Sequence, residues 1–156
     1  MKIRNKIRKA RGFTLIEVLV VIGIIAILAA IVLIAINPAR QFKLARDSQR
    51  IANVNAILNA IGQNISENHG LFTCAASSSV PTTPTVIKSS GGYDIASCIV
   101  PTYISAMPFD PSVAGAHYTS NTDYDTEYKI SEDSNSRITI SATSEISSST
   151  PISVTR

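Results

Sequence analysis

Charged residues, aromatic residues and cysteines are all scarce in this chain of 156 residues. Charged residues make up 16% of the chain, compared with roughly 25% in a typical soluble domain, and this composition excludes a disordered polyampholyte. Two cysteines are too few for a disulfide-dense miniprotein. The absence of Trp and the 6% of aromatic residues argue against a sugar-binding platform. What remains is a chain long enough for one ordinary domain.

Motifs that carry chemistry are absent from the sequence as well. His69 and His117 are its two histidines, and neither stands at a spacing typical of metal ligands. There is no G-x-S-x-G motif, no phosphate-binding loop and no Cys/His cluster. We therefore expect no enzymatic activity and no cofactor.

The basic charge of the chain is concentrated at its N-terminus. Residues 1–12 carry six basic side chains and no acidic one, whereas the rest of the chain has eight basic and eleven acidic residues. The isoelectric point near 9.0 therefore reflects a terminal tail. This distribution excludes a uniformly basic nucleic-acid-binding domain, so direct contact with nucleic acid is not expected. The six basic residues are Lys2, Arg4, Lys6, Arg8, Lys9 and Arg11.

A long apolar run, residues 13–36, follows this tail. From Val18 to Ile36 no residue has a polar side chain, and at ~1.5 Å per residue this part spans about 28 Å, close to the thickness of a bilayer core. The basic residues before it predict a cytoplasmic N-terminus and an outward C-terminal side. A single-pass anchor is one interpretation. A secretory signal peptide is another, although its apolar region is usually about 7–15 residues long.

Two residues favour a third interpretation of this segment. Glu17 places an acid about one turn inside the apolar run, where a carboxylate costs up to roughly 2.5–3.5 kcal/mol at mid-bilayer and less near the edge. The role of a plain anchor does not explain why the helix bears that cost. A helix that later leaves the bilayer and pairs with a positive charge would explain it. Gly12 lies between the basic tail and Phe13, where a protease could reach an extended backbone.

The stretch KARGFTLIE, residues 9–17, resembles the processing site of type IV prepilins and of the pseudopilins of type II secretion. The resemblance implies that a prepilin peptidase cuts between Gly12 and Phe13 on the cytoplasmic side, and that Phe13 is then N-methylated. It also implies that the apolar helix is first a membrane anchor and later the core of a filament. The resemblance is strong over residues 9–36, looser over 37–70 and weak beyond.

The physical chemistry of cleavage agrees with this resemblance. Removal of the leader creates an amine at Phe13, which Glu17 can neutralise in its own chain or in a neighbouring subunit. A paired carboxylate in a dry helical bundle costs much less than an isolated one, so the pair would fix axial register. The expected partners are other copies of this chain, the peptidase and methyltransferase, and an inner-membrane assembly platform with an ATPase motor that acts indirectly.

Beyond the apolar run, the sequence predicts a second helical stretch. Pro38 removes a backbone donor and disfavours helical geometry at Asn37, so we expect a helix bent near Pro38; the alternative is a new helix with Asn37 as its cap and Pro38 at its first position. Residues 39–68 are amphipathic, and Gly70 suits a C-terminal cap. The apolar stripe expected to pack on a small sheet consists of Ile51, Val54, Leu58, Ile61 and Ile65.

The first turns of this stretch are basic. Their expected environment in an isolated subunit is solvent or lipid headgroups, and in a filament they could meet acids on neighbouring subunits. The residues concerned are Arg40, Lys43, Arg46 and Arg50, with Asp47 among them.

From residue 71 onward the chain is rich in Ser and Thr, which is typical of strands and loops. Residues 75–92 are expected to form a surface loop, and the tail after Glu145 to be loosely held. Alternation predicts strands at residues 127–131 and 137–144, joined by a turn at 133–136, with a further strand near 117–119. Residues 107–111, MPFDP, resemble a connection that precedes the sheet in many pilins, with Met107 in place of the usual Leu.

Two candidate sites lie in this head region. Cys74 and Cys98 can form a disulfide on the outward side, where oxidation is permitted, and this bond would tie down a loop of about 25 residues; two free thiols are the alternative. Asp123, Asp125 and Glu127 could supply oxygen ligands to Ca²⁺, for which some pseudopilins give a precedent by resemblance. Alternating acids are also common on a solvated strand face, and no other metal site is expected.

The sequence therefore predicts an α+β, pilin-like chain whose long N-terminal helix packs through its C-terminal half on a small antiparallel sheet. Its segments are a cleaved basic leader (1–12), a transmembrane and filament-core helix (13–36), an amphipathic continuation (37–70) and a head (71–156) that contains the loop 74–98 and C-terminal strands.

The function expected from these features is that of a structural subunit of a type IV pilus-like filament. The precursor and monomer would lie in the cytoplasmic membrane with the head outside, and the assembled form at the cell surface. One alternative is a pseudopilin of a type II secretion or DNA-uptake machine, which forms a periplasmic pseudopilus. Another is a single-pass membrane protein that presents an extracellular binding domain.

Overall fold

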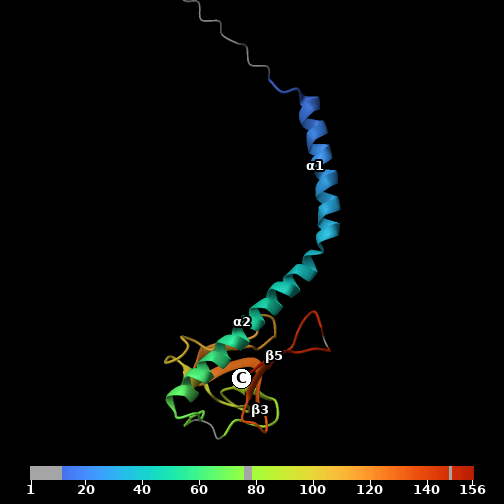
Figure 1. The fold of residues 1–156 in the computed structure, drawn as a ribbon. Coiled ribbons are helices and arrows are strands. Elements are labelled where there is room, and N and C mark those ends of the chain that lie inside the picture. Colours follow the sequence, from blue (N-terminus) through green and yellow to red (C-terminus); the bar gives the residue numbers. More distant parts are fainter. Residues whose placement is uncertain (1–11, 76–78, 148) are drawn as a thin grey trace, which may run out of the picture. The chain divides into compact units, whose positions relative to one another are not determined.

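The structure, a computed structural model, describes residues 12–75, 79–147 and 149–156. The basic side chains of the leader lie outside the described residues. The chain divides into two compact units, residues 1–39 and 40–156, which Figure 1 shows in the colours of the sequence.

Helix α1 (Leu15–Ile36) makes up most of the described part of the first unit. Its side chains are apolar on all faces apart from Glu17, and none of its residues is buried within the chain. It is long and apolar enough to cross a membrane. The helix ends at Asn37, whose φ of 47° lies in the left-handed region. An all-round apolar helix without a partner requires lipid or other helices to cover it.

Helix α2 (Pro38–Glu67) begins directly after Asn37. Pro38 is its first residue, a position where the missing N–H of proline removes no intrahelical hydrogen bond. The interruption expected near Pro38 is therefore a break of one residue between two helices. Pro38 takes the first position of a new helix, as in the alternative to a continuous bent helix, but Asn37 is the C-terminal cap of α1. At the other end, Gly70 has a φ of 90° and its N–H donates to the carbonyl of Ile65 at 2.9 Å, so the predicted C-terminal cap is confirmed.

The head is built on one hydrophobic core shared by α2 and the sheet. Val54, Leu58 and Ile61 of the predicted stripe are buried and Ile65 is partly buried, but Ile51 is 48% exposed, so its place in the stripe was predicted wrongly. Ile51 lies about 100° around the helix from its neighbour Arg50, whose side chain is the one that turns inward. Two further apolar residues of α2 are buried, Ile57 and Ala60, and neither belongs to the predicted stripe.

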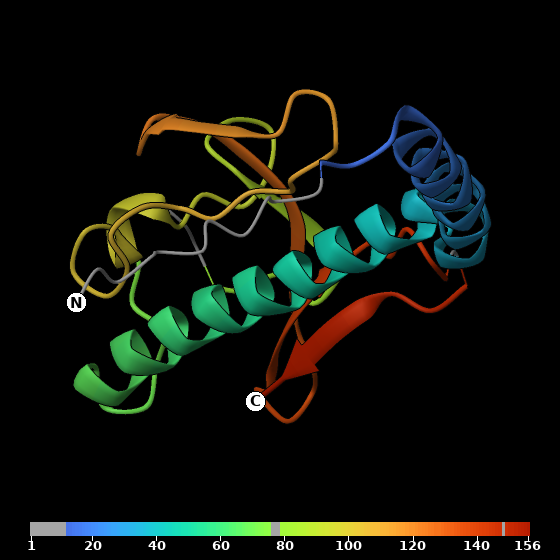
Figure 2. The ribbon, with the colours of Figure 1, turned by 90° about the horizontal axis from the view of Figure 1, so that it is seen from above.

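The sheet has five antiparallel strands, of which β3 (Asp123–Glu132) is the longest. On its two edges β3 pairs with β1 (Thr85–Lys88), β2 (His117–Ser120) and β4 (Ile138–Ala142), and β4 pairs in turn with β5 (Ile152–Thr155). Figure 2 shows α2 extending along the head near the C-terminal strand, and the side chain of Arg156 donates a hydrogen bond to Asn59 of α2. The predicted hairpin, its turn at residues 133–136 and the strand near 117–119 are all confirmed.

Three elements differ from the sequence-based expectations. Residues 75–92, expected to be a surface loop, contain β1, whose Ile87 is fully buried. The tail after Glu145, expected to be loosely held, contains β5, which pairs with β4 over four residues. A short helix, α3 (Ala96–Ile99), was not predicted. Each element is four residues long, and such short segments acquire their structure from the partners they meet in the fold.

Candidate functional site

The N-terminal end of α1 is closed by a capping box formed by Thr14 and Glu17. The N–H of Glu17 donates to Thr14 Oγ1 at 3.3 Å. In return, the backbone N–H and the hydroxyl of Thr14 donate to Glu17 Oε2 at 3.1 and 3.0 Å. These bonds satisfy backbone donors that the first turn of a helix otherwise leaves without a partner.

The capping box gives Glu17 a local role that was not among the expectations from the sequence. Thr-x-x-Glu before an apolar run is a recognisable start signal for a helix, and it was present in the sequence. A plain membrane anchor therefore also accounts for Glu17, contrary to the expectation from the sequence. Both hydrogen bonds to its carboxylate go to Oε2, and a carboxylate has about four lone-pair positions, so the box leaves capacity for a further donor.

Phe13 precedes the cap and is 86% exposed, and Gly12 lies outside the helix in a stretch without regular structure. A Cβ atom at Gly12 would meet no atom within 4 Å among the described residues. The peptide bond between these two residues thus lies in accessible chain without regular structure, just before the first helical turn. The geometry is compatible with cleavage at this position, which stays a prediction.

The second notable site is a cluster of five charged residues in the head, here called the Arg50 cluster: Arg46, Asp47, Arg50, Asp110 and Glu145. Arg50 lies at its centre and has a side chain that is only 2% exposed. Its Nε and Nη2 donate to the two oxygens of Asp110 at 2.7 and 2.9 Å, and its Nη1 donates to Asp47 Oδ1 at 2.7 Å. Planar, two-bond pairing of this kind is the strongest form of ion pair.

The other members of the Arg50 cluster attach the segment that follows β4 to α2. Glu145 lies between two guanidinium groups, with Arg46 Nε at 2.7 Å and Arg50 Nη1 at 2.9 Å from its Oε1. Asp47 accepts hydrogen bonds from Ser144 Oγ at 2.6 Å and from the backbone N–H of Glu145 at 3.0 Å. Three residues within two turns of α2 thereby hold two separate loops, residues 110–113 and 144–146.

The electrostatics of the Arg50 cluster favour its charged form. Burial raises the pKa of Asp110, but hydrogen bonds from Arg50 and from the N–H groups of Ser112 and Val113 outweigh it and hold the pKa below the ordinary value. Asp47 shows the same balance, with the N–H of Glu145 as its leading donor. The hydrogen bond from Arg46 contributes most to lowering the pKa of Glu145.

This geometry corrects the expectation for the basic residues of α2. Arg46 and Arg50 were expected to lie on a solvated or headgroup face, but Arg50 is buried and Arg46 is paired with Glu145. The acid that accepts two hydrogen bonds from Arg50, Asp110, belongs to the MPFDP segment. The sequence alone gave no signal for the ion pairs that α2 makes with Asp110 and Glu145, because the partners are 60 or more residues apart. Only Asp47 and Arg50, at i and i+3, are close in sequence.

The two cysteines are joined in the structure. Cys74 and Cys98 form a disulfide with their Cα atoms 5.3 Å apart, as the sequence predicted. The bond links the segment after α2 to helix α3.

The three residues considered for calcium do not converge. Asp123 pairs with His117 at 3.2 Å, and Asp125 accepts from the backbone N–H of Glu127 at 3.0 Å and faces Lys88 at 3.8 Å. Glu127 has a φ of 59° and lies in a bulge of β3. Within residues 12–75, 79–147 and 149–156, no group of three His, Cys, Asp or Glu side chains is arranged to hold a metal ion. Calcium binding by this set is therefore not supported.

A long apolar N-terminal helix and a head with a five-stranded antiparallel sheet define a pilin-like α+β protein. Residues 7–33 match the family model described as the prokaryotic N-terminal methylation motif. This motif is the signal of type IV pilins and pseudopilins, and it includes Gly12, Phe13 and Glu17. Comparisons with curated proteins and with solved structures gave no significant match.

Proposed function

We propose that this chain is the structural subunit of a type IV pilus-like surface filament. The main supporting observation is that the methylation motif at residues 7–33 covers most of α1, a helix that buries none of its apolar side chains in its own chain. The bilayer covers such a surface in the monomer, and the helices of other copies cover it in a filament. Copies of the same chain are the simplest partner because each brings an equally apolar helix.

Maturation begins with hydrolysis of the Gly12–Phe13 bond by a prepilin peptidase. This step removes all six basic residues of the leader and leaves a free amine on Phe13. The same enzyme system then places a methyl group on that amine, which keeps its positive charge. The charge stands at the N-terminal end of α1, where the helix dipole makes a cation unfavourable.

Glu17 offsets this unfavourable charge. Its carboxylate lies in the first turn of α1 and retains hydrogen-bonding capacity beyond the capping box. In an assembled filament it pairs with the Phe13 amine of the same chain or of a neighbour, and the pairing sets the axial register between subunits. Burial of the Leu, Ile and Val side chains of α1 against other subunits supplies most of the assembly energy.

The precursor lies in the cytoplasmic membrane with its basic leader inside and its head outside. An assembly platform and an ATPase motor drive the extraction of α1 from the bilayer, where its side chains are already in apolar surroundings. Packing against other subunits then repays the cost of extraction and stabilises the filament. The disulfide between Cys74 and Cys98 supports an outward location of the head, since oxidising compartments favour such bonds. The role of the chain is structural, without an enzymatic step of its own.

The test is expression of the full chain in cells with and without prepilin peptidase, followed by mass spectrometry and electron microscopy of sheared surface material. With the peptidase, the mass should fall by residues 1–12 and rise by one methyl group on Phe13. A Gly12→Val variant should remain uncut. Gly23→Ala is the matched control, because a Cβ atom there meets nothing within 4 Å and the residue lies far from the cleavage bond.

Different results would point to different proteins. Long surface fibres at natural expression would support the pilus subunit, whereas short polymers confined to the periplasm would indicate a pseudopilin. Retention of Met1 on functional protein would contradict the proposal and favour a single-pass membrane protein.

A further inference from the structure

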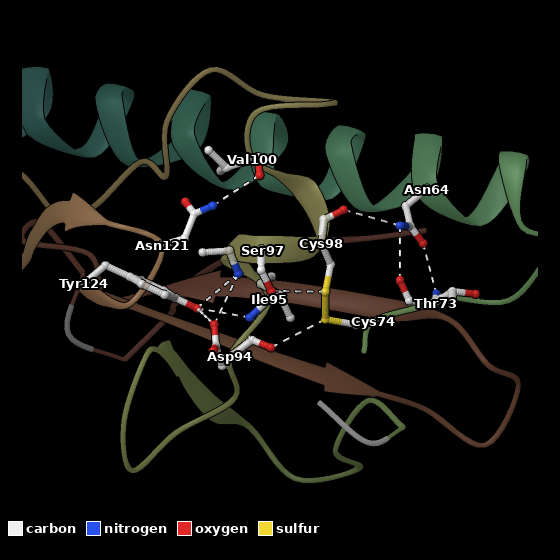
Figure 3. The surroundings of a disulfide bond; sticks show 11 residues. Asn64, Thr73, Cys74, Asp94, Ile95, Ser97, Cys98, Val100, Asn121 and Tyr124 are labelled. Atoms are coloured by element: carbon white, nitrogen blue, oxygen red, sulfur yellow. Dashed lines mark hydrogen bonds between the residues drawn. A yellow bond between two sulfur atoms is a disulfide. The ribbon is translucent and has the colours of Figure 1, made fainter. Parts of the chain in front are cut away.

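Helix α2, the segment after it and helix α3 meet at the side chain of Asn64, next to the disulfide (Figure 3). Asn64 is 5% exposed. Its Nδ2 donates to the carbonyl of Thr73 at 3.2 Å and to the carbonyl of Cys98 at 3.4 Å, and its Oδ1 accepts from the N–H of Thr73 at 3.0 Å. One amide group thus bonds the backbone next to Cys74 and the backbone of Cys98 itself.

The two cysteine-bearing segments are anchored to different extents. Cys98 lies in α3, whose Ala96 and Ile99 are fully buried. The hydroxyl of Tyr124 also fixes the start of α3, because it accepts from the N–H groups of Ile95 and Ala96 at 3.0 and 3.2 Å. The Cys98 side of the disulfide is therefore held by the core.

The Cys74 segment has fewer attachments to the core. Leu71, Thr73 and Ala75 are exposed, while Phe72 is partly buried and packs against the core. The two bonds between Asn64 and Thr73 hold the backbone one residue before Cys74. Asn64 and the disulfide therefore tether the same exposed segment, one by hydrogen bonds and the other covalently.

We propose that Asn64 is a positioning residue for formation of the Cys74–Cys98 disulfide. In the reduced head its amide holds the backbone beside Cys74 against that of Cys98, so that the two thiols meet before any bond forms. Oxidation then joins Cys74 Sγ to Cys98 Sγ: the two thiols give up two protons and two electrons, and a disulfide oxidant such as oxidised glutathione is reduced to two thiols. This role does not depend on whether the chain forms a filament.

The hydrogen bonds of Asn64 and the disulfide should stabilise each other reciprocally, and this makes the proposal measurable. If Asn64 raises the effective concentration of one thiol at the other, removal of Asn64 must make the disulfide easier to reduce. The full chain in detergent is equilibrated with mixtures of reduced and oxidised glutathione, quenched by alkylation, and the oxidised fraction is read by mass spectrometry. Asn64→Ala and Asn64→Asp should each lower the effective concentration by about tenfold, the size expected for loss of one or two hydrogen bonds.

Asn53 provides a matched control on the same helix. Its Nδ2 donates to the carbonyl of Phe109 at 3.2 Å and to the hydroxyl of Tyr128 at 2.9 Å, and none of these bonds involves a cysteine-bearing segment. Asn53→Ala should lower the stability of the head but leave the effective concentration of the thiols nearly unchanged. An equal fall in both variants, or no fall in the Asn64 variants, would overturn the proposal.

A second measurement leaves Asn64 unchanged and so does not depend on whether its variants fold. In a Cys74→Ser, Cys98→Ser chain, the amide hydrogen of Thr73 should remain protected from exchange, because Asn64 Oδ1 still accepts it. Thr73 is an exposed residue, so its protection reports mainly on this bond. Loss of that protection on removal of the disulfide alone would show that the covalent bond positions Asn64, and not the reverse.

Discussion

Arg50 of α2 and Asp110, 60 residues further along the chain, form a two-bond ion pair in which the side chains are 2% and 3% exposed. Asp110 also accepts hydrogen bonds from the N–H groups of Ser112 and Val113 at 2.9 and 3.0 Å. The pair therefore fixes a loop to a helix and also organises the loop internally. A buried pair of this kind adds little over apolar packing while it is intact, but its disruption is costly.

Removal of Arg50 should destabilise the head strongly. In Arg50→Ala, Asp110 and Asp47 remain near the core without their guanidinium partner, and the free energy of unfolding should fall by about 3–5 kcal/mol. Urea denaturation, monitored by the near-ultraviolet circular dichroism of the tyrosines, measures this free energy of unfolding. The control is Arg137→Ala, which breaks an ion pair with Asp133. The side chains of Arg137 and Asp133 are 60% and 34% exposed, so this substitution should cost less than about 1 kcal/mol. Equal losses in the two variants would contradict the importance of burial.

The stability of the head should decline in acid. The pKa values of Asp47, Asp110 and Glu145 are held below the ordinary 3.8, 3.8 and 4.5 in the folded chain. A lowered pKa contributes stability that is fully present above the ordinary value and is lost as the pH falls through the folded value. The contribution of these three carboxylates to the free energy of unfolding should therefore be level near neutrality and fall below about pH 4.5. In Arg50→Ala this decline should be shallower, and an identical pH profile would argue against the cluster as its cause.

Replacement of Glu17 should separate membrane insertion from assembly. Glu17→Ala removes an acid from an otherwise apolar helix, so insertion should be retained or improved, whereas filament yield should fall sharply because the Phe13 amine loses its partner. Membrane fractionation and electron microscopy measure the two properties. Thr14→Val is the control, because it removes the hydroxyl half of the capping box but keeps the carboxylate. Filaments that form normally without Glu17 would refute its proposed role.

Loss of the disulfide should lower stability without abolishing the fold. The bond closes a loop with a sequence separation of 24, for which the chain-entropy model gives roughly 3.5 kcal/mol. Cys74→Ser, Cys98→Ser and the double variant should all lose the same amount, because each lacks the same cross-link. Thermal unfolding of the four proteins tests this expectation. Additive losses in the double variant would show that the thiols contribute through packing as well.

Glu127 offers a site for stabilisation. Its φ of 59° is a left-handed conformation, which costs a residue with a Cβ atom roughly 1–2 kcal/mol and glycine much less. The conformation allows a bulge in β3: Val86 and Lys88 of β1, two positions apart, pair with Lys129 and Asp125, four positions apart. Glu127→Gly should raise the free energy of unfolding by up to about 1 kcal/mol. Lys129→Gly, in an extended part of the same strand, should lower the free energy of unfolding. A lower free energy of unfolding in both variants would contradict the explanation by backbone strain at Glu127.

Several features of the head were predictable because their signals are local. The stripe of Val54, Leu58 and Ile61 follows the helical period, and the strands that contain Tyr128 and Ile140 alternate with a period of two. The turn at residues 133–136 is composed of residues that favour turns. In these segments each residue's environment depends mainly on neighbours within a few positions, so the pattern is sufficient.

Strands β1 and β5 and the Arg50 cluster were not predictable in this way. The sequences TVIK and ISVT are rich in β-branched residues, and ISVT alternates apolar and polar side chains, but four residues are too few to distinguish a strand from a loop. They become strands because they pair with β3 and β4. Arg50 resembled its basic neighbours in sequence, and only the return of the chain with Asp110 and Glu145 allowed it to be buried.

The sequence by itself determined helix α1, which makes up most of the described part of the first unit. A run of apolar side chains without polar interruption, preceded by KARGF and a Thr-x-x-Glu cap, specifies a helix that requires lipid or other helices around it, whatever the rest of the chain does. Only the tertiary structure decided which charges of α2 are buried, which short segments are strands and which amide lies beside the disulfide. These features depend on residues far apart in the chain, and the free energy that fixes them exists only after the backbone has brought their partners together.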